Sequence, residues 1–255
     1  MRTSDKKVYL DYAATTPVDE RVFGAMCPYF CDTFGNADSV HSFGMEAAVA
    51  VDDARRRIAA LMGATRTEIY FTSGGTEADN WAVKGGALAA SAVGRKKIVI
   101  SAIEHPAVTE SAMFMRKLGF EVVRVPVDGQ GRVRPEDVGK VVDGGTAIVS
   151  VMLANNEVGT VQPAAEIAKI AHDAGALFHT DAVQAAGGMR LDVKSLGADM
   201  MTISSHKFYG PKGCGVLYVK KGITIEPLIS GGHQEREARG GTTNVAAVVG
   251  MAEAL

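Results

Sequence analysis

The chain has 255 residues, of which 47% are hydrophobic and 22% are charged, and its formal net charge at pH 7 is -2. This length and composition allow one large domain with a substantial core and exclude a disordered chain. The nearly balanced charge gives no electrostatic reason to expect nucleic acid or an anionic membrane as a partner, so neither is expected.

The N-terminal residues 1–7 are polar and run straight into a predicted strand. No apolar stretch approaches the length that crosses a bilayer. We therefore expect a cytoplasmic protein.

Three cysteines in this length argue against a disulfide framework. Cys27 and Cys31 stand four residues apart, without a second pair at metal-ligand spacing. The sequence therefore predicts buried, inert thiols at these two positions and no metal site.

Seven short apolar runs rich in branched residues are predicted strands. They cover residues 69–71, 97–101, 121–125, 147–152, 176–180, 200–204 and 215–219. Segments with helical spacing lie between most of them, at 46–62, 77–92, 107–118, 135–142 and 164–174. This alternation predicts an α/β fold, with a mainly parallel seven-stranded sheet flanked by helices.

Several polar residues lie at or just after the ends of these strands: Ser73, His105, Asn155, Asp181 and Lys207. In parallel sheets a ligand sits beyond the carboxyl ends of the strands, so these residues are expected to converge on one edge. The region 231–242, rich in glycine and charge, is predicted to be a mobile surface loop.

A possible phosphate cradle lies at residues 71–80, where a predicted strand ends in Gly74 and Gly75 before a helical stretch. Backbone amides at the start of that helix, with the hydroxyl group of Thr76, suit a phosphate dianion. Thr76 can also cap the helix, and the two roles are compatible.

Lys207 follows the apolar strand and is flanked by small and hydrogen-bonding residues. Such a lysine can be desolvated enough to lose its proton and attack a carbonyl, which is Schiff-base chemistry. The alternative is a solvated loop lysine.

An aldehyde cofactor such as pyridoxal phosphate also needs an anion beside its ring nitrogen and a donor near its phenolic oxygen. Asp181, after an apolar strand, is a candidate for the anion, although it also suits a helix N-cap. Gln184 is a candidate for the phenolic oxygen.

Together these motifs resemble the cysteine desulfurases, within the class V aminotransferase group of pyridoxal-phosphate enzymes of fold type I. Further blocks that carry the resemblance are 8–17, 34–36, 104–108 and 155–160, which stand in the family's order. The resemblance covers nearly the whole chain and implies pyridoxal 5'-phosphate as the cofactor.

The resemblance implies a role for each matching residue. Lys207 would hold the cofactor, His105 would stack over its ring and move protons, and Ser204 and His206, with Gly75 and Thr76, would bind its phosphate. Without the resemblance, His105 reads as a satisfied loop histidine, and Ser204 and His206 as residues that bond their own loop.

Two more residues take roles from the family alone. Asn155 would lie near the substrate amino group and the ring oxygen, although it can also be a turn residue. Thr242 matches a threonine that crosses a dimer interface to the other subunit's phosphate, which implies a homodimer.

The implied reaction converts L-cysteine to L-alanine and leaves the sulfur as a cysteine persulfide, for iron-sulfur cluster or thio-cofactor synthesis. A sulfur acceptor or iron-sulfur scaffold protein would be a partner. Alternatives are another class V activity, such as a selenocysteine lyase or an aminotransferase, and a non-catalytic homologue that only binds the cofactor.

The family places its sulfur-accepting cysteine and the arginine for the substrate carboxylate in a C-terminal part that lies beyond Leu255 here. Cys214 is a poor candidate for the acceptor. We therefore expect 1–17 to contribute to a small domain, 18–255 to be the pyridoxal-phosphate-binding large domain, and the rest of the small domain to be absent from a truncated chain.

Overall fold

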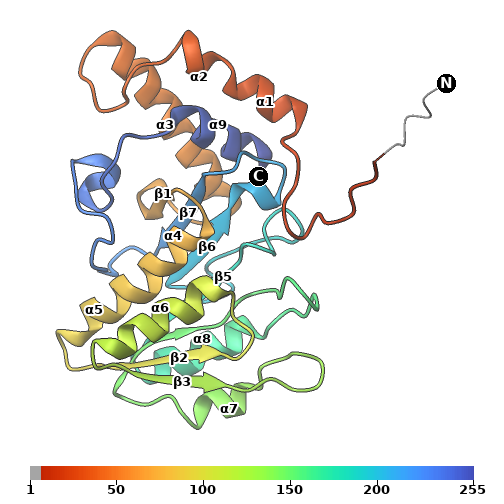
Figure 1. Ribbon diagram of the computed structural model, residues 1–255. Helices are drawn as coiled ribbons and strands as arrows, with labels where there is room; N and C mark the ends of the chain where they lie inside the picture. The colour runs from red at the N-terminus through yellow and green to blue at the C-terminus, as the bar shows by residue number, and fades with distance from the viewer. Residues whose placement is uncertain (1–6) are drawn as a thin grey trace.

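The computed structural model describes residues 7–255 and contains one seven-stranded sheet. The strands are β1 (Ile69–Thr72), β2 (Lys97–Ser101), β3 (Glu121–Val125), β4 (Thr146–Ser150), β5 (Leu177–Asp181), β6 (Met200–Ser204) and β7 (Gly215–Val219). Their order across the sheet is β1-β7-β6-β5-β4-β2-β3, and β7 runs antiparallel to both of its neighbours (Figure 1). The remaining pairs are parallel. The predicted fold class is confirmed.

Helices cover both faces of the sheet (Figure 1). They are α1 (Glu20–Met26), α2 (Pro28–Cys31), α3 (Ser42–Leu61), α4 (Gly75–Asn80), α5 (Gly86–Ser91), α6 (Pro106–Lys117), α7 (Pro135–Gly139), α8 (Ala164–Asp173) and α9 (Val245–Ala254). A π-helical turn, Trp81–Gly85, joins α4 to α5 into one helical run. All five predicted helical segments contain helix, whereas α1 and α2 were not predicted.

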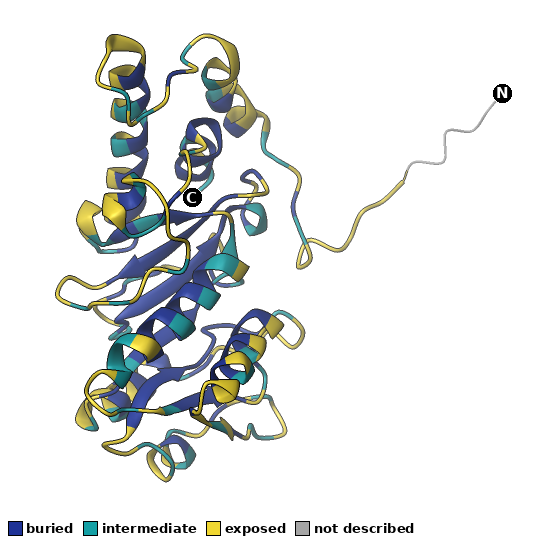
Figure 2. Ribbon diagram, turned by 60° about the vertical axis from the view of Figure 1, so that its left-hand side comes forward, coloured by how far each residue is buried: buried dark blue, intermediate teal, exposed yellow. Residues whose placement is uncertain are grey.

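The core lies on both sides of the sheet, as successive side chains of a strand point to opposite faces. On β4, Val149 packs into the cluster formed with α3, α8 and α9, and Ile148 packs into the cluster formed with α4, α5 and α6. Figure 2 shows the strands and the inward sides of these helices as buried. The double cover explains why the central strands are continuous apolar runs.

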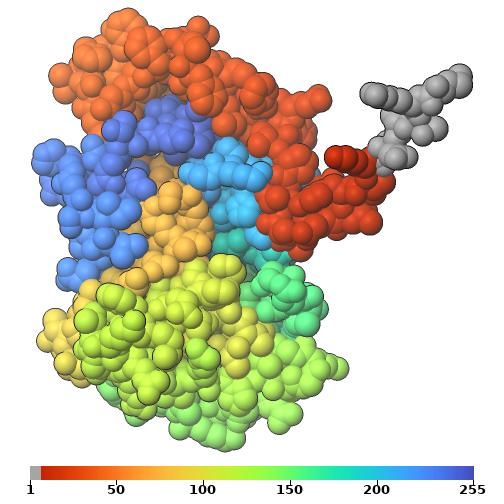
Figure 3. Space-filling view, in the orientation of Figure 1, coloured from red at the N-terminus to blue at the C-terminus, as the bar shows by residue number. Residues whose placement is uncertain are grey.

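The first described residues lie against the loop that follows β6. Both the backbone N–H and the hydroxyl group of Thr16 donate to the carbonyl oxygen of His206, each over 2.9 Å. The hydroxyl oxygen of Thr16 accepts from the N–H of Tyr209 at 2.8 Å. Residues 7–12 project from the body (Figure 3), and Leu10 is 86% exposed. Among the described helices, none is both long and apolar enough to cross a membrane.

The region 231–242 is more than a surface loop, which corrects the prediction. Its short helix η4 (Gln234–Glu237) buries Glu235, whose two carboxylate oxygens each accept a 2.7 Å hydrogen bond from Arg55. Glu235, Arg236 and Glu237 all have positive φ angles, of 47°, 58° and 67°. The ion pair therefore anchors a strained turn.

The prediction of buried thiols at Cys27 and Cys31 is wrong, because both residues are exposed. Cys31 ends α2, a single-turn helix that buries none of its residues, and Cys27 links it to α1. Cys214 is buried.

Candidate active site

The carboxyl ends of the parallel strands meet at a cavity of about 480 Å³. Eight of the ten residues predicted for the site line it: Gly75, Thr76, His105, Asp181, Gln184, Ser204, His206 and Lys207. They come from α4, from the loop before α6, and from the segments that follow β5 and β6. Loops far apart in the sequence thus bring their polar groups to one edge of the sheet.

Lys207 ends the short helix η3 (Ser205–Lys207), which directly follows β6. Its Nζ donates to the carbonyl oxygen of Ala14 at 3.0 Å and to that of Ala13. Burial lowers the pKa of the half-buried amine, and the negative charge of Asp181 opposes this shift. A lowered pKa increases the fraction of the neutral amine that a nucleophile requires.

The loop around Lys207 is tightly built. A side chain at Gly210 would place its Cβ 1.9 Å from the Ser205 hydroxyl oxygen, and Tyr209 has a φ angle of 66°. The N–H of Gly210 donates to the carbonyl oxygen of Ser205 at 3.1 Å. Such a constrained loop fixes the origin of the lysine side chain.

The cradle at the start of α4 depends on glycine. Gly74 has a φ angle of 149°, which favours glycine, and a Cβ at Gly75 would lie 2.8 Å from Val183 Cγ2. Because Gly74 occupies the N-cap and has no side chain to cap the helix, the amides of the first turn are available to an anion.

Two further cradle candidates, Ser204 and His206, line the same cavity. The Nδ1 atom of His206 lies 3.1 Å from the Thr15 hydroxyl oxygen. Burial lowers the pKa of His206, and the nearby positive charges of Lys207 and Lys212 lower it further. A neutral imidazole can donate one hydrogen bond to a phosphate oxygen.

Asp181 is the last residue of β5 and is only 4% exposed. One of its oxygens accepts from the N–H of Val183 at 2.9 Å. Burial raises the pKa of Asp181, whereas the hydrogen bond from Val183 and the positive charge of Lys207 lower it. A further cationic donor beside it, such as a protonated ring nitrogen, would stabilise its charged form.

Gln184 lines the cavity with its amide group. Its Oε1 atom is buried and accepts no hydrogen bond from any residue in the range 7–255. A buried amide oxygen without a donor is costly, so a ligand with a hydroxyl group is the partner that this position fits.

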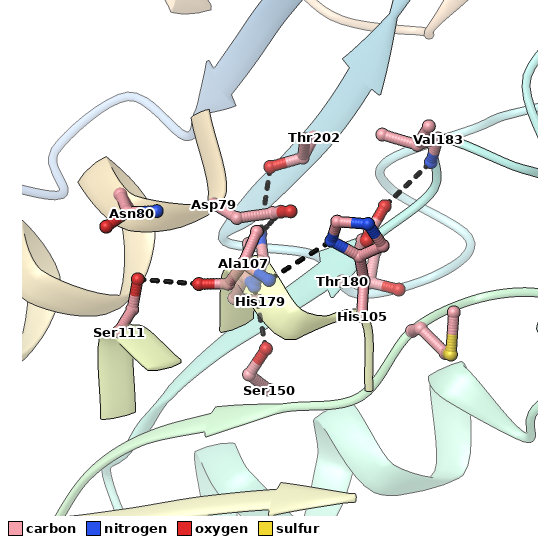
Figure 4. A network of polar contacts seen from close by, with 12 residues as sticks. Asp79, Asn80, His105, Ala107, Ser111, Ser150, His179, Thr180, Val183 and Thr202 are labelled. Atoms are coloured by element: carbon pink, nitrogen blue, oxygen red, sulfur yellow. Dashed lines mark hydrogen bonds and ion pairs between the residues drawn. The ribbon is translucent and has the colours of Figure 1, made fainter. Parts of the chain in front are cut away.

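His105 is the N-cap of α6, and its Nδ1 atom accepts from the N–H of Ala107 at 3.1 Å (Figure 4). This bond orients the ring and requires Nδ1 to be unprotonated. Proton exchange is therefore left to Nε2.

The other two predicted residues do not line the cavity. The side chain of Asn155 is used in contacts within the protein: Nδ2 donates to the carbonyl oxygen of Ile103, in the loop after β2, and Oδ1 accepts from the N–H groups of Glu157 and Val158. Its neighbour Asn156 lines the cavity instead.

Thr242 is exposed and is the last residue of the region 231–242. A two-bond ion pair between Arg239 and Glu77, at 2.8 and 3.0 Å, ties that turn to α4. The predicted dimer role of Thr242 stays a prediction.

Two buried acids, Asp79 in the cavity lining and Glu104 behind Met152, were not assigned a role from the sequence. Glu104 accepts from the Ser101 hydroxyl group and, at 2.8 Å, from the N–H of Met152, and burial raises its pKa to about 8. Asp79 lines the cavity and is 1% exposed. The spacing of Asp79, four residues after Gly75, was the available signal, because such residues share one face of a helix.

Comparison with known proteins identifies the class. Residues 8–255 match the family described as aminotransferase class-V, and the chain belongs to that family. The family consists of pyridoxal-phosphate enzymes.

Individual relatives narrow the comparison. The chain is 50% identical to "Cysteine desulfurase IscS" of Dictyoglomus turgidum, over 98% of this chain and 63% of that protein. It is 48% identical to the protein of the same name from Methanosarcina thermophila, over 99% of this chain and 62% of that protein. It therefore spans less than two thirds of the length of these relatives.

Solved structures agree with the sequence matches. A structure described as a NifS-like protein superposes with a TM-score of 0.94 at 42% identity, over 97% of this chain and 68% of that one. Another structure, titled "SspA in complex with cysteine", also superposes with a TM-score of 0.94. It is 37% identical, and the match covers 97% of this chain and 72% of that one.

Proposed function

We propose that this chain binds pyridoxal 5'-phosphate in the cavity and holds it through Lys207. The observation that carries the proposal is the convergence of a pKa-lowered lysine, a buried aspartate and an orphaned amide oxygen on one cavity. The cofactor supplies an electron sink for bonds broken at an amino acid's carbon atoms.

The residues of the chain divide the work of binding. The first-turn amides of α4 with Thr76, Ser204 and His206 would hold the phosphate, while Asp181 would pair with the ring nitrogen. Gln184 would accept a hydrogen bond from the phenolic hydroxyl group at Oε1, which has no protein donor. His105, with Nδ1 occupied by Ala107, would move protons at Nε2.

For the protein to which this chain belongs, we propose a cysteine desulfurase activity. Relatives named as cysteine desulfurases and a similar protein solved with cysteine support L-cysteine as the substrate. In this reaction the carbon–sulfur bond breaks, sulfur passes to a thiolate to form a persulfide, and the remaining carbon skeleton takes up a proton as L-alanine. The sulfur would serve iron-sulfur cluster or thio-cofactor synthesis through an acceptor or scaffold protein.

The acceptor thiolate is not supplied by the cavity. None of the three cysteines lines it, all of which lie in the described range 7–255. Burial raises the pKa of Cys214 to about 12, which keeps this thiol protonated and inert. We propose that in the complete protein a thiolate from outside this cavity accepts the sulfur. We propose also that Thr242 makes the contact between the two subunits of a homodimer.

The test is the visible absorption of the purified chain with pyridoxal phosphate. Wild type and Lys212→Ala, a control on the same loop, are expected to gain an absorption band, and Lys207→Ala is expected to lack it. A band in Lys207→Ala equal to that of wild type would contradict the assignment of the lysine.

Substrate class is tested by adding L-cysteine or L-selenocysteine to the same samples, then assaying alanine with sulfide or selenide. Alanine and sulfide from L-cysteine would support the desulfurase. Alanine from selenocysteine alone would point to the lyase, and a Lys207-dependent band without turnover would leave this chain as a cofactor-binding part of the enzyme.

A further inference from the structure

A line of polar side chains runs beneath the cavity on the face of the sheet that α4 covers. His179 on β5 is fully buried; its Nδ1 lies 2.8 Å from the Ser150 hydroxyl oxygen and its Nε2 lies 3.1 Å from the Thr202 hydroxyl oxygen. Asp181 lies two residues farther along β5, on the same face and beside the cavity. This line connects the interior of the sheet with the proposed cofactor site.

Asp79 closes this line from the side of α4. Figure 4 shows its carboxyl group beside His179 and Thr202, and Oδ1 lies 3.7 Å from Nε2 of His179. Within residues 7–255, Oδ1 receives no hydrogen bond. An acceptor that is 1% exposed and lacks a donor is costly, unless the group carries its own proton.

The surrounding charges also favour a protonated Asp79. Burial, and then repulsion from Asp181, raise its pKa well above the ordinary value, and the nearby Glu104 acts in the same direction. His179 does not compensate, because burial lowers its pKa to about 3 and leaves the ring neutral. The hydroxyl group of Thr202 lowers the pKa of Asp79, but burial and the neighbouring acids outweigh it.

Asp181 differs from Asp79 in its partners. It lines the same cavity as Asp79, accepts the N–H of Val183 and faces the positive charge of Lys207, and Val183, Lys207 and the neighbouring Asp79 all lower its pKa. Two neighbouring carboxyl groups with one proton between them place that proton on the group with fewer stabilising partners. Asp79 is that group.

We propose that Asp79 is a positioning residue, which donates a hydrogen bond from its protonated carboxyl group to Asp181 and thereby keeps Asp181 negatively charged for the ring nitrogen of pyridoxal phosphate. The inference rests on the proposed cofactor site. For this role, residue 79 must be a hydrogen-bond donor and must carry no negative charge.

The test compares Asp79→Asn, whose amide keeps a donor, with Asp79→Ala, which removes it. Pyridoxal phosphate labelled with ¹⁵N in the ring is the probe, and its ¹⁵N chemical shift reports whether the ring nitrogen is protonated. Wild type and Asp79→Asn are expected to give the protonated shift and dissociation constants within about threefold of each other. Asp79→Ala is expected to move the shift toward the unprotonated value and weaken binding about 10- to 100-fold, the effect of losing a hydrogen bond to a charged group.

Each result has a defined meaning. Asp79→Ala with wild-type affinity and chemical shift would overturn the proposal, and so would Asp79→Asn behaving like Asp79→Ala. If the alanine variant does not fold, Asp79→Leu fills the same volume with apolar atoms and replaces it in the comparison. A wild-type protein without Lys207-dependent binding would instead mean that the proposed cofactor site itself is wrong.

Discussion

Two buried carboxylate regions of this molecule contrast in how their charge is compensated. Under the turn 231–242, Glu235 is held by both arms of the Arg55 guanidinium group and by the N–H of Phe71 at 3.0 Å. Beside the cavity, Asp79, which lines it, and Glu104, which does not, each keep a buried oxygen without a partner in the described chain. We call the first the closed region, because its buried charges are fully paired within the protein. We call the second the open region, because its buried carboxyl oxygens beside the cavity have no protein partner.

The contrast follows from what each region does. A buried charge that is fully paired fixes one local structure, here the left-handed turn from Glu235 to Glu237. A buried acid without a cation keeps a raised pKa and can hold a proton near a ligand. The same residue types thus serve anchoring in one place and proton storage in the other.

Breaking the closed region is expected to have the largest effect. Arg55→Met leaves Glu235 as an uncompensated buried carboxylate and should lower the free energy of unfolding by about 3–5 kcal/mol. Urea unfolding followed by tryptophan fluorescence measures this. Arg57→Met is the control, because the Arg57–Glu253 pair is 45% and 37% exposed, and should cost below about 1 kcal/mol.

The double variant Arg55→Met with Glu235→Met sharpens the result. It removes both charges, so it should be more stable than Arg55→Met alone. A double variant as unstable as the single one would show that the loss came from packing around Phe71, over whose ring the guanidinium lies at 4.5 Å.

The open region is tested by pH. The pKa of Glu104 is raised by burial from 4.5 to about 8, so the folded state binds a proton that the unfolded state has released. Its stabilising contribution is therefore complete below about pH 4.5 and is lost as the pH rises toward 8. The free energy of unfolding of the cofactor-free chain should fall by about 2 kcal/mol from pH 6 to pH 8 through this group alone.

Glu104→Gln is expected to remove that part of the pH dependence, because the amide resembles the protonated acid in shape. Glu110→Gln, on the exposed side of α6, should follow the wild-type curve. If Glu104→Gln kept the full wild-type slope, the slope would have to come from Asp79 and Asp181, whose pKa values burial also raises.

A smaller effect is expected at the rim of the open region, where Gly75 forms the cradle. In Gly75→Ala the new Cβ would lie 2.8 Å from Val183 Cγ2 and 3.4 Å from Ser204 Cβ, so the chain must shift. We expect a loss of about 1–2 kcal/mol in stability and weaker pyridoxal phosphate binding. Gly129→Ala, with no atom within 4 Å of its Cβ, is the matched control and should change neither.

The sequence predicted the residues that line the cavity better than the closed region, for a physical reason. Strand periodicity and the order of the polar residues after each strand depend on local sequence, and eight predicted site residues meet at one cavity. The Arg55–Glu235 pair joins residues 180 positions apart, so no local pattern reveals it.

The residues that the sequence did not predict are also defined by contacts between distant parts of the chain. Asp79 and Asp181 line one cavity only because α4 packs against β6 and β7, so the pair appears only in three dimensions. The burial of a thiol likewise depends on which face of a short helix packs inward, as the exposure of Cys27 and Cys31 shows. Domain assignment at residues 1–17 stays a prediction.

The smallest predicted effect concerns the three thiols, whose reactivity reports whether the protein around them is packed or open. Cys214 is buried near Glu235 and Arg239, burial raises its pKa to about 12, and its Sγ lies 3.6 Å from Sδ of Met251. A thiol reagent such as iodoacetamide should therefore modify Cys27 and Cys31 in the native chain and leave Cys214 unmodified, as read by mass spectrometry of the digested protein. Replacing Cys27 or Cys31 by serine should change stability by less than about 0.5 kcal/mol. In Arg55→Met, Cys214 should become reactive under conditions where the wild-type thiol is protected, because the nearby turn that carries Glu235 and Arg239 has lost its ion pair. Cys214 could instead stay protected in Arg55→Met while the variant loses much of its stability. That result would mean that the turn does not open separately and that the ion pair stabilises the fold as a whole.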